Sequence, residues 1–108
     1  MSEQQVPAGV IPYVDHHTGE RRILTLHLTS GNSMLTGKNP PLVTIDGRQY
    51  LVYWGSVAFE VPADRAVHVS VHIEADRIGQ AASALLPPGS SLALTYSTDF
   101  MSGTGSLR

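Results

Sequence analysis

The dipeptide Asp46-Gly47, which lies between two short apolar runs, restricts the fold more than any other feature of the sequence. A two-residue β-turn of type I′ needs positive φ angles at both central residues, and Asp-Gly adopts them readily. The dipeptide therefore predicts a β-hairpin within the segment from Pro41 to Glu74. The two-residue turn also fixes the register, in which the facing pairs are Ile45 and Arg48, Thr44 and Gln49, Val43 and Tyr50, and Leu42 and Leu51.

Both faces of this predicted hairpin are apolar near its open end. Successive side chains of a strand point to opposite faces, so the hairpin residues divide into two sets. One set is Val43, Ile45, Tyr50 and Val52, and the other is Leu42, Leu51 and Tyr53. We therefore expect the open end of the hairpin to be covered on both sides.

Residues 67–74 show a strict period of two, with valine or isoleucine alternating with histidine, serine or glutamate. This pattern is typical of a strand with one buried and one solvated face. Residues 22–29 alternate in the same way, and their leucines should face the core. Residues 57–61 precede a turn signal at 62–65, which predicts a second hairpin with residues 66–74. Gly55 should permit a corner that takes the chain to another layer.

Two further strands are expected near the C-terminus. Residues 81–86 are rich in alanine, but the segment is short and lies between Gly79 and Pro87, which favours a strand over a helix. Residues 92–97 alternate clearly between apolar and polar side chains. Together these segments predict an all-β fold, an antiparallel β-sandwich of about seven strands.

The predicted sandwich occupies residues 22–98 of a chain of 108 residues, which is the length of one domain. Residues 1–21 are interpreted as a flexible N-terminal arm, in which Val10 and Ile11 could pair with a sheet edge. Residues 99–108 are interpreted as a flexible tail or a short edge strand.

Composition limits the function classes. With 7 basic and 9 acidic residues the chain has a net charge of -2, which lacks the basic excess expected of a nucleic-acid binder. There is no cysteine, which excludes disulfides, thiolate zinc sites and cysteine nucleophiles. The N-terminus does not resemble a signal peptide and no apolar run is long enough for a membrane helix. We therefore expect a soluble, cytoplasmic protein that is not inserted in a membrane.

The turn chemistry resembles that of a known class of module. The stretches concerned are Val43-Thr-Ile-Asp-Gly47, Trp54-Gly55, Phe59-Glu-Val-Pro-Ala63, Val67-His-Val-Ser-Val71 and Leu92-Ala-Leu-Thr-Tyr96. They resemble small β-sandwich modules of the PEGA type and uncharacterised bacterial proteins from actinobacteria. The resemblance implies a non-catalytic, Ig-like structural or interaction module and carries over no functional residues.

No catalytic motif is present. No serine lies in Gly-x-Ser-x-Gly and no glycine-rich run has the spacing of a phosphate-binding loop, so we predict that the protein is not an enzyme. His68 and His72 share one face of a strand, yet their spacing of about 13–14 Å is too large for one zinc ion. We predict no metal and no cofactor. The alternative is a small metal-dependent or ligand-binding protein that uses His27, His68 and His72.

The better candidates for function are apolar side chains near the surface. If Tyr53 and Trp54 point to opposite faces, at least one of them can be exposed; the alternative is that these aromatic side chains pack in the core. Met34 and Leu35 lie in a polar loop, residues 30–40. These four residues are the predicted interaction surface, for an unidentified protein partner or for a homodimer formed through a sheet edge.

Overall fold

A computed structural model describes residues 10–11, 19–29, 40–74, 78–99 and 104–108. This part of the chain holds nine strands and no helix. The strands are β1 (Val10–Ile11), β2 (Arg21–Leu28), β3 (Pro41–Ile45), β4 (Arg48–Leu51), β5 (Gly55–Pro62), β6 (Val67–Glu74), β7 (Ile78–Leu86), β8 (Leu92–Asp99) and β9 (Thr104–Leu107). The seven predicted strands correspond to β2–β8, and short strands are added at both ends of the chain.

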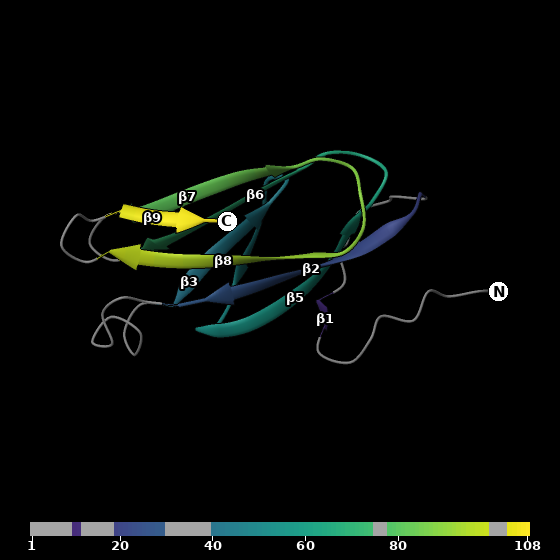
Figure 1. Cartoon of the computed structure of the whole chain (residues 1–108). Coiled ribbons are helices and arrows are strands. Elements are labelled where there is room, and N and C mark those ends of the chain that lie inside the picture. Colours follow the sequence, from purple (N-terminus) through teal and green to yellow (C-terminus); the bar gives the residue numbers. More distant parts are fainter. Residues whose placement is uncertain (1–9, 12–18, 30–39, 75–77, 100–103) are drawn as a thin grey trace.

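The strands form two sheets, which Figure 1 shows one behind the other. One sheet has five strands in the order β1-β5-β2-β8-β9, and the other has four in the order β4-β3-β6-β7. The predicted antiparallel arrangement is wrong for two pairings, because β1 is parallel to β5 and β2 is parallel to β8. Both parallel pairings join strands that are distant in the sequence, where no turn determines their direction.

The inner faces of the two sheets share one hydrophobic core, as the alternating patterns predicted. The leucines of β2 and the valines of β6 are all buried, while the residues between them point outward or are only partly covered. Burying apolar surface is the main favourable contribution to folding. The buried core residues are Leu24, Leu26, Leu28, Val43, Ile45, Val52, Phe59, Val61, Val67, Val69, Val71, Leu86 and Tyr96.

The hairpin of β3 and β4 confirms the turn prediction. Asp46 and Gly47 both have positive φ, at 47° and 89°. The register is the predicted one, from the pair Ile45 and Arg48 at the turn to the pair Leu42 and Leu51. The local turn chemistry was therefore sufficient to fix both strands relative to each other.

The chain passes between the sheets at Gly55, where φ is 120°, a value that L-residues rarely adopt. This confirms the predicted corner, since β4 belongs to the four-stranded sheet and β5 to the five-stranded one. The predicted second hairpin is wrong. Residues 63–66 return the chain to the other sheet, so that β5 pairs with β1 and β2 while β6 pairs with β3 and β7.

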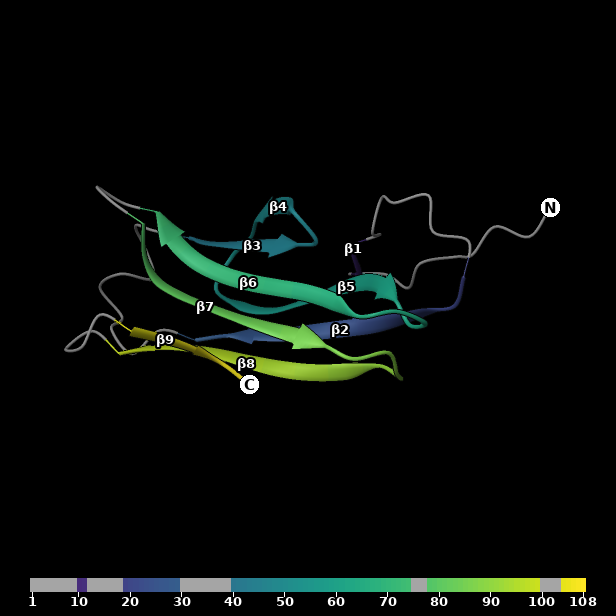
Figure 2. The ribbon, with the colours of Figure 1, turned by 90° about the horizontal axis from the view of Figure 1, so that it is seen from above.

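The C-terminal half closes one side of the fold. Residues 81–86 belong to strand β7, as expected, and residues 104–107 form β9 on β8. The edge strands β7 and β9 of the two sheets lie side by side in Figures 1 and 2. No helix in the described ranges is long and apolar enough to cross a membrane.

Candidate interaction surface

Strand β4 forms one edge of the four-stranded sheet, and β3 is its hydrogen-bonded neighbour. Figure 2 shows it at the margin of the fold. The amide of Val52 donates to the carbonyl oxygen of Pro41 at 3.2 Å. Because backbone groups alternate in direction along a strand, Tyr50 and Val52 bond toward β3, and Gln49 and Leu51 turn their amides and carbonyls to the open edge. The edge therefore offers unpaired backbone groups at Gln49 and Leu51.

The large exposed apolar side chains lie on or next to the four-stranded sheet. Leu51 is 71% exposed, Leu85 is 68% exposed and Tyr53, two residues beyond Leu51, is 88% exposed. Leu51 and Leu85 point away from the core, because their neighbours Val52 and Leu86 are buried. The expectation that the open end of the hairpin is covered on both sides is wrong, since β4 is an edge strand whose outer face is open. Tyr53 therefore lies at the surface, as the predicted interaction surface requires.

Trp54 has the opposite orientation. It is half-buried, packs against the core and stacks on the buried ring of Tyr96, with ring centroids 6.2 Å apart and planes 24° apart. Burial raises the pKa of Tyr96 to about 12, because the ionised phenolate would lose its hydration. Trp54 therefore contributes chiefly to packing. Met34 and Leu35, the other predicted contacts, lie outside the described residues.

The described side chains on the outer face of the four-stranded sheet carry little charge. They include two histidines and no lysine, arginine, aspartate or glutamate. They are Leu42, Thr44, Gln49, Leu51, His68, Ser70, His72, Ala81, Ser83 and Leu85. The outer face of the five-stranded sheet, in contrast, holds an ion pair between Arg21 and Glu60 at 2.7 Å. A face with few charges costs less to dehydrate, which suits it to contact with another protein.

The three candidate histidines are not brought together. His27 lies on the outer face of the five-stranded sheet, where its Nδ1 is hydrogen-bonded to Ser56 Oγ at 2.8 Å. His68 and His72 alternate with buried valines of β6 and so lie on the outer face of the other sheet. The core separates His27 from the other two. In the described part of the chain, no three histidine, cysteine, aspartate or glutamate side chains are grouped to hold a metal ion.

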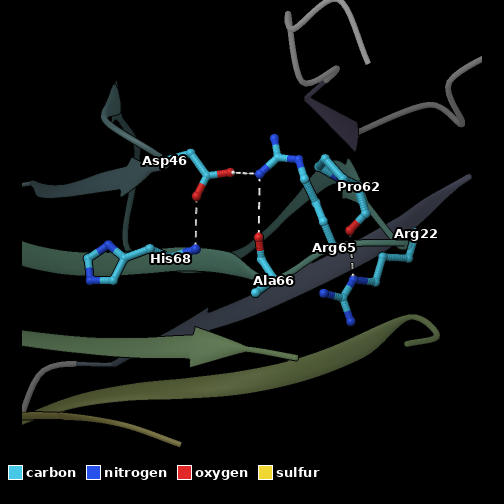
Figure 3. Close-up of polar contacts among 6 residues, drawn as sticks. All are labelled: Arg22, Asp46, Pro62, Arg65, Ala66 and His68. Carbon is cyan, nitrogen blue, oxygen red and sulfur yellow. Dashed lines mark hydrogen bonds and ion pairs between the residues drawn. The ribbon is translucent and has the colours of Figure 1, made fainter. Parts of the chain in front are cut away.

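Asp46 connects the tip of the β3–β4 hairpin to β6, as Figure 3 shows. Its Oδ1 accepts a hydrogen bond from the amide of His68 at 2.9 Å, and its Oδ2 lies 3.0 Å from Nη1 of Arg65. The amide of Asp46 in turn donates to the carbonyl oxygen of His68 at 2.9 Å. The same nitrogen of Arg65 donates to the carbonyl oxygen of Ala66 at 3.4 Å. These contacts hold the turn from which β4 begins.

Sequence reasoning missed Arg22, which is only 5% exposed. Its Nε donates to the carbonyl oxygen of Pro62 at 3.0 Å, and its Nη2 is buried without a partner. The signal was present in the sequence, because Arg22 stands two residues before Leu24 and so shares the inward face of β2.

The sequence and the structure were compared with protein-family models, with curated proteins and with solved structures, and nothing matches in any of the three comparisons.

Proposed function

We propose that this chain is a non-catalytic protein-interaction or assembly module, with an Ig-like or PEGA-like β-sandwich fold, that binds by adding a partner strand to β4. The resemblance of its turn sequences to PEGA-type modules supports this assignment. The cysteine-free sequence supports a cytoplasmic location, and the resemblance to actinobacterial proteins supports a bacterial one.

One observation carries the proposal. The open backbone groups of Gln49 and Leu51 lie next to Leu51 and Tyr53, the two most exposed large apolar side chains among the described residues. In strand addition, main-chain hydrogen bonds supply affinity and alternate side chains supply selectivity. Both components are present on this one edge. The strand has no proline, bulge or lysine, which commonly protect edges, and its one charged residue, Arg48, stands at its first position.

A second copy of the chain is the simplest partner. We consider an antiparallel pairing in which Tyr50 of one copy faces Tyr50 of the other. The outward backbone groups of Gln49 in each copy then face those of Leu51 in the other copy. Arg48 then does not face Arg48 of the second copy, so like charges are not opposed. The pairing would extend the four-stranded sheet across the interface without changing either copy.

The test is a comparison of Gln49→Pro with Gln49→Ala. Proline at position 49 removes an amide that points to the open edge, so no hydrogen bond to β3 is lost and the fold should persist. The alanine variant removes the same side chain and retains the amide. We expect self-association, measured by sedimentation equilibrium, to be lost in Gln49→Pro and kept in Gln49→Ala.

A heterologous partner is tested with the same pair of variants. Proteins captured by the wild-type chain from its native host are purified, and their dissociation constants are measured for wild type, Gln49→Pro and Gln49→Ala. The proposal predicts weakening of tenfold or more, about 1.4 kcal/mol, for the proline variant only. Equal affinity of all three chains for every partner, with no self-association, would contradict it.

A further inference from the structure

The guanidinium of Arg22 is a buried positive charge at the end of the fold where β2 begins. Arg22 shares the inward face of β2 with three leucines, and its Nη2 has no hydrogen-bond partner. An unpaired charge in a protein interior is costly, and each unsatisfied donor adds its own desolvation cost. A bound anion would pair with the guanidinium charge and accept a hydrogen bond from Nη2, which would remove both costs.

Two carboxylates of the described residues, those of Glu60 and Asp46, are paired with other arginines. Glu60 forms an ion pair with Arg21, and Asp46 forms one with Arg65. Figure 3 shows the Asp46 carboxylate facing Arg65, with Arg22 contacting Pro62 and not this pair. The guanidinium is therefore held by a neutral carbonyl oxygen.

The connections at residues 63–66 and 87–91 meet at the end of the fold where Arg22 lies. A Cβ at Gly89 would lie 3.5 Å from Nη1 of Arg22, which places the β7–β8 connection directly beside the guanidinium. The amide of Gly89 donates to the carbonyl oxygen of Ala63 at 2.9 Å, and the amide of Ala63 donates to that of Glu20 at 2.7 Å. Residues 87–91 are themselves exposed, so solvent reaches the outer side of this connection.

We infer that Arg22 binds a small oxyanion, a phosphate or a carboxylate, at the end of the fold that Ala63 and Gly89 close. The planar guanidinium offers paired N–H groups that match two oxygens of such an anion, and Nη2 is free to donate one of them. Entry of the anion requires movement of residues 87–91, which are joined to the rest of this end through single hydrogen bonds of Gly89 and Ser91. This inference is independent of the proposed strand addition.

The first experiment measures the thermal unfolding midpoint during titration with inorganic phosphate, sodium acetate or sodium chloride at matched ionic strength. A ligand that binds only the folded state at ten times its dissociation constant should raise the midpoint of a domain this size by roughly 6–10 °C. We expect that rise with phosphate, acetate or both, relative to chloride. A rise with phosphate alone identifies a tetrahedral anion, and a rise with acetate alone identifies a carboxylate.

The matched variants locate the site. Arg22→Met should abolish the difference between oxyanion and chloride. Gly89→Asp should place a carboxylate beside the guanidinium, which raises the midpoint without added anion and removes the response to phosphate, and Gly89→Asn should do neither. The backbone at Gly89 does not have the positive φ that would exclude a side chain.

The inference is overturned if phosphate and acetate act no differently from chloride, or if their effect survives in Arg22→Met. If Arg22→Met does not fold, the aspartate variant decides: an unchanged phosphate response in Gly89→Asp also overturns the assignment.

Discussion

A single carboxylate, that of Asp46, fixes the tip of the hairpin that presents β4. Replacement by asparagine keeps an oxygen that can accept the hydrogen bond from His68 and tolerates the positive φ of 47°, and it removes the ion pair with Arg65. Exposed ion pairs contribute little. We expect Asp46→Asn to cost less than about 1 kcal/mol and Asp46→Ala about 1–3 kcal/mol, measured by urea unfolding. Equal losses in the two variants would show that the hydrogen bond to His68 is unimportant.

The buried phenol of Tyr96 makes stability depend on pH at alkaline values. Its pKa rises from 10.0 in the unfolded chain to about 12 in the fold. The resulting stabilisation is fully present below pH 10 and is lost as pH rises toward 12, because the unfolded chain ionises first. We expect Tyr96 to account for a loss of up to about 3 kcal/mol in the free energy of unfolding over that range. Tyr96→Phe should show a correspondingly shallower decline, and an identical pH profile would contradict the assignment.

For single residues, the sequence left open which of Tyr53 and Trp54 is exposed, and the structure shows that it is Tyr53. Alternation placed Tyr53 and Trp54 on opposite faces, but no local signal said whether either of them, or which, would be exposed. Tyr96 decides this, because its ring supplies the surface on which Trp54 stacks. Tyr96 lies in β8, 42 positions along the chain from Trp54, so the contact could not be predicted from the residues next to Trp54.

The corner between β4 and β5 depends on a glycine. Gly55 has a φ of 120°, and no atom lies within 4 Å of the position where a Cβ would be built. The cost of a side chain there is therefore one of backbone conformation. We expect Gly55→Ala to lower the free energy of unfolding by about 1–3 kcal/mol, measured by denaturant unfolding.

The matched control is Gly89→Ala, which adds the same methyl group where φ is not positive and the nearest atom is 3.5 Å away. The free energy of unfolding of Gly89→Ala should lie within about 0.5 kcal/mol of the wild-type value. Similar losses at both glycines would mean that the φ angle of Gly55 is not what the corner requires.

Individual elements were predictable where short-range chemistry determines them. Asp46-Gly47 fixed a register that holds for every pair of the hairpin, and the leucines of β2 and valines of β6 predicted their buried faces. The connection at residues 63–66 shows the limit. A turn signal says that the chain reverses, but a reversal within one sheet and a return to the opposite sheet use similar residues. The predicted hairpin of β5 with β6 was wrong for this reason.

The arrangement of the whole molecule depends on pairings between distant parts of the chain. The parallel pairing of β2 with β8 places Leu24 opposite Leu92 and Leu28 opposite Tyr96. Buried and exposed residues alternate in the same way in parallel and antiparallel strands. The alternation in β2 and β8 therefore does not predict the direction of their pairing.

The two sides of the molecule differ in whether their edge strands lie beside another strand. On one side β7 and β9 approach each other, and on the other β4 is an open edge with exposed Leu51 and Tyr53 beside it. This asymmetry is the basis of the proposed binding mode, and neither the composition nor the strand count of the sequence predicts it.

Amide hydrogen exchange, followed residue by residue by NMR, tests the binding mode most directly. In the free chain, Tyr50 and Val52 should exchange slowly, because their amides bond to β3, and Gln49 and Leu51 should exchange rapidly at the open edge. When a second copy or a purified partner binds, the account predicts that Gln49 and Leu51 gain protection while the alternation along β4 disappears. Protection that appears only on β8 and β9, with Gln49 and Leu51 still exchanging rapidly in the complex, would contradict it.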